Sequence, residues 1–190
     1  MPSSSLTKKE RYLLTVRGEE TDHPPAWIMR QAGRYMPEYM EMRRRYTFRD
    51  FCLDAEVSAE ATMLPLRLLD ADILIIFNDI LIPLEEMGLR VEFPEGGPTI
   101  TNPVRSEADL KHFRAVPSFA DPPVARSLRR LRERAGPDVP VLGFCGSPFT
   151  LALYASEGKV SRNHQYLKRL MYTNPAVLHE MLDRIADTAA

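Results

Sequence analysis

The sequence predicts an α/β protein whose strands pair in parallel. Three short apolar segments, residues 26–29, 72–76 and 140–144, have the composition of strands, and helical patterns follow them. The second segment is dominated by branched apolar residues, which is typical of a strand buried on both faces. Polar residues follow the strands, as in (β/α)8 TIM barrels, whose active sites gather at the carboxyl ends of the strands.

The length indicates only part of such a barrel. A (β/α)8 barrel needs at least roughly 200 residues and typically about 250. The chain has 190 residues and supplies about three βα units. We therefore expect residues 1–190 to be the N-terminal part of a single barrel domain in a longer protein. Strands that are apolar on both faces invite mispairing at open edges, so we expect the 190 residues alone to pack poorly.

Composition excludes several classes of protein. The chain is 44% hydrophobic and 27% charged with a formal net charge of −1, so no overall field favours nucleic acid or an anionic membrane. No apolar run approaches the roughly 20 residues of a membrane span, and the N-terminus lacks the apolar core of a secretory signal. The two cysteines, Cys52 and Cys145, have no zinc-ligand spacing. We expect a cytoplasmic protein with no metal and with both thiols free and buried.

The N-terminal elements are marked by local signals. Thr7 and Glu10 form the capping-box pattern of a helix that ends before Gly18. Residues 22–25, Asp-His-Pro-Pro, break the chain before the first predicted strand. Residues 56–69 have the spacing of a helix, with Pro65 predicting a kink or a division into two shorter helices. The apolar face of this helix would contain Val57, Ala61, Leu64 and Leu68.

Residues 42–51 combine four arginines with three aromatic residues, a mixture that nucleic-acid-binding segments also show. Acidic residues before, within and after the segment dilute its charge, so a solvated helix face is the favoured interpretation.

The C-terminal half predicts a hairpin followed mainly by helices. Residues 89–101 have the pattern of a small hairpin. Helices are predicted at residues 106–113, 122–135, 149–155 and 161–172, and from Asn174 to the end of the chain. In the last, Asn174 would be the cap and Pro175 the first helical residue. The arginines of residues 122–135 (Arg129, Arg130, Arg132 and Arg134) are expected on a solvent face.

The stretch from Pro25 to Tyr39 carries the strongest signal for a site. Arg30 and Arg34 stand four residues apart, beside Gly33, after the first predicted strand. A guanidinium pairs with a carboxylate through two parallel hydrogen bonds, so this pair predicts a pocket for an anionic ligand. Alternatively, both arginines cover a sheet edge or pair with Glu38 and Glu41.

Asp79 and Tyr154 follow the second and third predicted strands. Parallel strands place their carboxyl ends together, so we expect both side chains near Arg30. Burying a carboxylate is costly unless it meets a cation or several N–H donors. Asp79 could therefore be an internal partner of Arg30 or Arg34, and Tyr154 could be a core aromatic residue.

Three segments resemble the uroporphyrinogen decarboxylase family in the same order: MRQAGRYMPEY (29–39), IIFNDILIPLEEMGLRVEF (75–93) and VLGFCGSPFTLALYASEG (141–158). The resemblance extends from about Arg11 to the last residue. It implies a carboxy-lyase that removes the carboxyl groups of the four acetate side chains of uroporphyrinogen III and gives coproporphyrinogen III, in heme biosynthesis. It further implies that the enzyme uses no cofactor and is a homodimer.

The resemblance also implies roles for particular residues. Asp79 would face the pyrrole N–H groups and stabilise a cationic ring, and Tyr154 would orient an acetate arm. Arg30 and Arg34 would bind substrate carboxylates, and Arg30 would assist proton delivery. The remaining pocket residues would be Gln31, Ala32 and Phe77. A serine and a histidine with functions in the family would lie beyond Ala190, so we expect the isolated 190 residues to be inactive.

Two other interpretations remain open. Cobamide-linked methyltransferases of the same superfamily have a similar fold and hold zinc through late His and Cys residues, which would also lie beyond this chain. The segment RQAGRY favours the decarboxylase. The other interpretation is a non-catalytic gene fragment.

Overall fold

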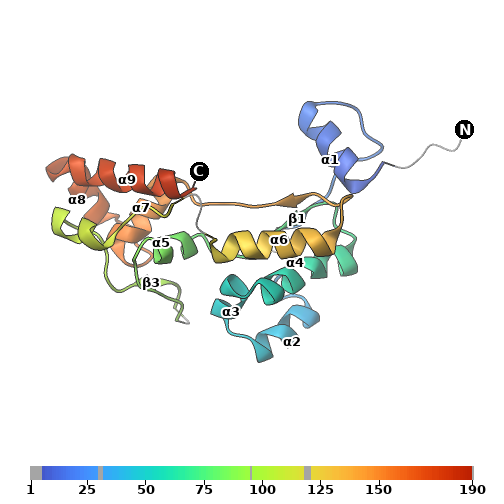
Figure 1. Cartoon of the computed structure of the whole chain (residues 1–190), viewed down its shortest axis with the longest axis horizontal. Helices are drawn as coiled ribbons and strands as arrows, with labels where there is room; N and C mark the ends of the chain where they lie inside the picture. The colour runs from blue at the N-terminus through green and yellow to red at the C-terminus, as the bar shows by residue number, and fades with distance from the viewer. Residues whose placement is uncertain (1–5, 30–31, 95, 118–120, 190) are drawn as a thin grey trace, which may run out of the picture. The chain divides into compact units, whose positions relative to one another are not determined.

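The computed structural model describes residues 6–29, 32–94, 96–117 and 121–189. The chain forms two compact units, each built from two segments of sequence. The first unit comprises Met1–Asn78 and Pro123–Phe144, and the second comprises Asp79–Pro122 and Cys145–Ala190. Figure 1 shows the elements of both units along the chain.

The first unit is a parallel strand pair covered by helices. Strands β1 (Leu74–Ile75) and β4 (Val141–Leu142) pair in parallel, with Leu74 opposite Val141 and Ile75 opposite Leu142. Helix α4 packs against β1, α6 packs against β4, and the two helices pack side by side (Figure 1). This arrangement confirms the α/β class and the parallel pairing of two predicted strands. The helices of this unit are α1 (Lys8–Arg17), α2 (Pro37–Arg45), α3 (Phe48–Leu53), α4 (Ala55–Leu69) and α6 (Pro123–Ala135).

The second unit is mainly helical. Its hairpin consists of β2 (Val91–Glu92) and β3 (Thr99–Ile100), which pair antiparallel and confirm the prediction for residues 89–101. One continuous apolar core joins the hairpin to α7 and α9, with Phe113, Leu151 and Met181 fully buried. The helices are α5 (Ile82–Glu86), the 3-10 helix η1 (Glu107–His112), α7 (Pro148–Glu157), α8 (Gln165–Thr173) and α9 (Pro175–Ala189).

The first predicted strand is wrong. Residues 26–29 belong to no strand, and Ile28 and Met29 are 56% and 73% exposed. Ala26 is tied to Asp72, just before β1, by two hydrogen bonds. An apolar run of four residues does not specify a partner strand, and a strand forms only where the backbone meets one.

Helix signals written in neighbouring residues are confirmed. Thr7 and Glu10 form both hydrogen bonds of the capping box, and Gly18 ends α1 in the left-handed conformation with φ 75°. Pro175 is the first residue of α9, as predicted. The division at Pro65 is wrong, because α4 is a single helix through this proline. The prediction of Leu68 on the buried face is also wrong, since Leu68 is exposed.

The arginines of α6 do more than face solvent. Arg130 and Arg134 both form ion pairs with Glu56 of α4, and Arg134 also binds Glu60 at 2.8 Å. These residues tie α6 to α4 at the edge of the first unit. The expectation of two buried thiols also needs correction, because Cys52 is buried and Cys145 is exposed.

Candidate functional site

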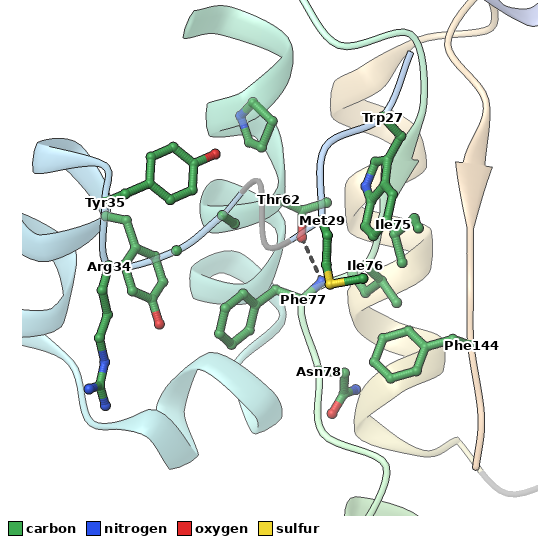
Figure 2. A pocket seen from close by; sticks show the side chains of 14 residues that line it. Trp27, Met29, Arg34, Tyr35, Thr62, Ile75, Ile76, Phe77, Asn78 and Phe144 are labelled. Carbon is green, nitrogen blue, oxygen red and sulfur yellow. Dashed lines mark hydrogen bonds between the residues drawn. The ribbon is translucent and has the colours of Figure 1, made fainter. Parts of the chain in front are cut away.

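A cavity of about 880 Å³ lies in the first unit, at the point where β1 ends. Its wall combines the backbone turn at residues 32–35 with the end of β1 and with side chains from α2 and α4 (Figure 2). The labelled side chains are Trp27, Met29, Arg34, Tyr35, Thr62, Ile75, Ile76, Phe77, Asn78 and Phe144. This volume lies within the range of small-molecule sites, which are mostly apolar with a few polar groups.

One wall of the cavity is aromatic. The ring of Phe77 lies 5.8 Å from that of Tyr39 and 5.2 Å from that of Phe51, measured between centroids. Tyr39 and Phe51 in turn meet edge to face at 5.3 Å. Such clusters bury a large apolar area in fixed geometry, so this wall offers a rigid surface for a flat apolar ligand.

Tyr39 adds a polar atom to this wall. The residue is buried, and burial raises the pKa of its phenol, while the positive charges of Arg43 and Arg34 oppose this effect. The phenol therefore stays protonated at neutral pH and can act as a hydrogen-bond donor.

The structure brings three of the predicted site residues together. Ala32, Arg34 and Phe77 all line the cavity, with Arg34 exposed at its rim. Glu41, which the sequence offers as an alternative partner of the two arginines, binds Arg44 and Arg45 at 3.0 and 2.9 Å. Arg30 and Gln31 lie outside the described residues.

Asp79 belongs to the second unit. Its Oδ1 accepts a hydrogen bond of 2.9 Å from the backbone N–H of Leu81, just before α5. Burial raises the pKa of the Asp79 carboxyl above its usual range, and the Leu81 N–H partly offsets this. A nearby positive charge would favour the ionised form of such a buried carboxyl. Perturbed carboxyl pKa values are common at functional sites.

Tyr154 also belongs to the second unit and lies on α7. It is half-buried and packs against the core of that unit. Its ring borders a separate cavity of about 200 Å³, together with Lys159, Ser161 and His164. The packing of Tyr154 against the core agrees with the alternative of a core aromatic residue, and its functional role stays a prediction.

Several cavity residues were not predicted. Tyr39 lies in the stretch that suggested the site, and Phe144 ends the third predicted strand as Phe77 follows the second, so their positions could have indicated them. Thr62 gives no such signal, because a threonine within a helix is commonplace. Trp27 and Met29 belong to the first predicted strand, which does not form, and both line the cavity instead.

No group of three or more His, Cys, Asp or Glu side chains that could hold a metal occurs among residues 6–29, 32–94, 96–117 and 121–189. Within the same residues, every helix is too short or too polar to cross a membrane.

The fold and the cavity define an α/β protein with an apolar, aromatic pocket and a cationic rim. Residues 7–190 match the family "Uroporphyrinogen decarboxylase (URO-D)", and the chain belongs to this family. It is 44% identical over 181 residues to a uroporphyrinogen decarboxylase from Carboxydothermus hydrogenoformans, which covers 94% of this chain and 52% of the relative. A uroporphyrinogen decarboxylase from Synechococcus is 42% identical over 189 residues, or 98% of this chain and 52% of the relative.

The chain therefore spans about half the length of the curated relatives that it matches. Among solved structures, a methyltransferase from Methanosarcina mazei is similar, with a TM-score of 0.68 and 19% identity over 97% of this chain and 54% of that protein. At this identity the similarity concerns the fold alone.

Proposed function

We propose that this chain supplies the substrate pocket of a uroporphyrinogen decarboxylase. The observation that carries the proposal is the cavity in which Ala32, Arg34 and Phe77 meet, because these residues come from two of the three segments that resemble the family. An aromatic wall suits the face of a pyrrole macrocycle, and a guanidinium at the rim suits one of its carboxylates.

The proposed reaction removes carbon dioxide from the four acetate side chains of uroporphyrinogen III and gives coproporphyrinogen III. Protonation of a pyrrole ring makes it an electron sink. The bond between the acetate methylene and its carboxylate then breaks, its electron pair enters the ring, and carbon dioxide leaves. A proton then adds to the methylene carbon to give a methyl group, and the ring loses the proton that it took up. Each carbon dioxide released thus consumes one proton overall, and the sequence needs no cofactor.

Asp79 is the residue to which we assign stabilisation of the cationic ring. One pair of unit charges at about 4 Å, in an effective dielectric near 20, is worth about 4 kcal/mol. If this attraction exists only in the transition state, it corresponds to about three decades in rate. Burial raises the pKa of the Asp79 carboxyl, so the positive charge of a neighbouring ring would be needed to favour the ionised form that this role requires.

The other predicted residues take supporting roles in the proposal. Arg34 and Arg30 bind carboxylates, Arg30 also assists proton delivery, and Gln31 helps to line the pocket. Tyr154 orients an acetate arm. We further propose that both units belong to the N-terminal part of one (β/α)8 barrel domain, and that the complete enzyme is a cytoplasmic homodimer in heme biosynthesis.

Trp27 provides a direct test of the pocket. It is the chain's one tryptophan and it lines the cavity, so a ligand that enters should quench its fluorescence. We expect uroporphyrin to quench Trp27 in a saturable manner and Arg34→Ala to weaken binding about tenfold. Arg90→Ala, at an exposed arginine of the second unit, should leave binding unchanged. Absence of saturable quenching in the parent chain would contradict the proposal.

We also propose that residues 1–190 alone do not decarboxylate uroporphyrinogen, because they span about half of the relatives' length. A pocket open to water would weaken the attraction between Asp79 and the cationic ring, since water raises the local dielectric. The measurement is release of carbon dioxide from uroporphyrinogen by monodisperse protein. Turnover at the level of a complete enzyme would show that this part of the proposal is wrong.

A further inference from the structure

Two buried hydroxyl groups on α4 hold the backbone of Phe77. Ser58 donates a hydrogen bond of 2.8 Å from its Oγ to the carbonyl oxygen of Phe77. The N–H of Phe77 donates one of 2.9 Å to Oγ1 of Thr62, which itself donates to the carbonyl of Ser58 at 2.8 Å. Ser58 and Thr62 are 0% and 1% exposed and lie one helical turn apart. Figure 2 marks the bond between Thr62 and Phe77.

These hydroxyl groups act where the strand ladder stops. The N–H groups of Leu74 and Ile76 each bind a carbonyl of the neighbouring segment at 3.0 Å, those of Pro140 and Leu142. At Phe77, one residue further on, the backbone N–H and carbonyl bind the side chains of Thr62 and Ser58 instead. A buried backbone group needs a hydrogen-bond partner, so the two side chains replace the neighbouring strand at this point.

The position of the Phe77 backbone decides where its ring lies. The ring packs between Tyr39, Phe48 and Phe51, and it forms part of the cavity wall. A valine in place of Thr62 would fill nearly the same volume but could neither donate to Ser58 nor accept from Phe77. The two buried hydroxyl groups thus bind the backbone at the end of the strand, and the Thr62 hydroxyl also binds its own helix.

We propose that Ser58 and Thr62 are positioning residues of the cavity, which hold Phe77 as a fixed part of its wall. Phe77 also begins the short connection Phe77-Asn78-Asp79, so the same bonds fix the chain two residues before the proposed catalytic carboxylate. The effect on porphyrin affinity rests on the proposed function, whereas the effect on the Phe77 backbone and ring does not.

The chain contains a matched control for this test. Thr188 of α9 donates to the carbonyl of Arg184 at 2.8 Å and accepts from the N–H of Val116 at 3.0 Å. The arrangement is the same as at Thr62, a helical threonine that joins its own helix to a neighbouring backbone N–H. Thr188 belongs to the second unit and does not line the cavity. Thr188→Val therefore removes two hydrogen bonds of the same kinds without altering the cavity wall.

The experiment compares Thr62→Val, Thr62→Ser and Thr188→Val with the parent chain. Amide hydrogen exchange of Phe77 and the contact between the Phe77 and Tyr39 rings are followed by NMR, and uroporphyrin affinity by quenching of Trp27. We expect Thr62→Val to speed exchange at Phe77 at least tenfold, to weaken the ring contact and to weaken binding about tenfold. Thr62→Ser should restore all three to within about threefold. Thr188→Val should speed exchange at Val116 and leave binding unchanged.

Each outcome decides the proposal. If Thr62→Val leaves both the ring contact and the affinity at the parent values, the hydroxyl groups do not position Phe77. If Thr62→Val does not fold, Ser58→Ala removes only the bond to the Phe77 carbonyl, and an unchanged ring contact and affinity there would overturn the proposal equally. If the parent chain binds no porphyrin, the proposed function is wrong, and the Phe77 ring contact alone decides whether the residue is positioned.

Discussion

Asp72 and Ala26 exchange two hydrogen bonds, one through a side chain and one through the backbone. The N–H of Ala26 donates to Oδ2 of Asp72 at 2.8 Å, and the N–H of Asp72 donates to the carbonyl of Ala26 at 3.0 Å. The other oxygen of the same carboxylate, Oδ1, accepts a bond of 2.7 Å from Arg11. Asp72 thus ties the start of the segment that carries Arg30 and Arg34 to the start of β1.

We predict that Arg11→Met destabilises the chain by about 3 kcal/mol, because it removes the ion pairs of Arg11 with Asp22 and with the buried Asp72, and leaves Lys8, at 3.9 Å, as the cation beside Asp72. The side chains of Arg11 and Asp72 are only 7% and 8% exposed. Unfolding in urea measures the change. Lys8→Met is the control, since Lys8 lies 3.9 Å from Asp72 and otherwise binds the exposed Asp70. An equal loss of unfolding free energy in Arg11→Met and Lys8→Met would contradict the prediction.

We predict that Asp79→Asn gains stability relative to the parent as the pH rises. A carboxyl whose pKa is raised by folding stabilises the fold below its unfolded pKa, and this contribution is lost as the pH passes through the folded-state pKa. Asparagine keeps an acceptor for the Leu81 N–H but cannot ionise. Unfolding between about pH 4 and pH 7 measures the difference, which should grow with pH.

The same variant tests chemistry in a complete, active enzyme. There, Asp79→Asn should lower turnover by about three decades, since the attraction to the cationic ring is lost. Turnover near the parent value would remove Asp79 from its proposed role.

We predict that Gly88→Ala is far more damaging than Gly18→Ala. Both glycines have a positive φ, 106° at Gly88 and 75° at Gly18, so either substitution strains the backbone by about 1–2 kcal/mol. At Gly88 an added Cβ would also lie 2.0 Å from the carbonyl oxygen of His112, whereas at Gly18 it would meet nothing within 4 Å. Thermal unfolding of both variants tests this, and similar melting temperatures would contradict it.

We predict that Glu157→Ala destabilises the second unit by about 1–3 kcal/mol. The buried carboxylate accepts hydrogen bonds from the N–H groups of Tyr166 and Leu167, at 2.8 and 3.1 Å, in the first turn of α8. His164, the residue before this helix, provides no side-chain cap. Glu157→Gln keeps an acceptor oxygen, so its loss of unfolding free energy should be less than half that of Glu157→Ala. A loss equal to that of alanine would mean that charge matters more than the hydrogen bonds.

Features encoded by neighbouring residues could be predicted from the sequence. The capping box of Thr7 and Glu10, the start of α9 at Pro175 and the hairpin of β2 and β3 depend on local chemistry. The strand predicted at residues 26–29 does not form, because whether an apolar segment becomes a strand depends on a partner far along the chain.

The candidate site also contains residues that the sequence predicts and residues that it does not predict. The spacing of the arginines predicts Arg34, the resemblance predicts Ala32 and Phe77, and all three line the cavity. The roles of Ser58 and Thr62 could not be predicted, since nothing in the helix sequence indicates that its hydroxyl groups bind a backbone 15–19 residues away.

The interleaved composition of the two units constrains how the chain folds during synthesis. The first unit needs Pro123–Phe144, because β1 pairs with β4 and the acidic side chains of α4 bind arginines of α6. Residues 79–122 must leave the ribosome before that segment, which at roughly 5–20 residues per second takes several seconds. During this interval β1 has no partner strand, so we expect its apolar side chains to be accessible to chaperones. Slowing translation between Asn78 and Phe144 would prolong this exposure.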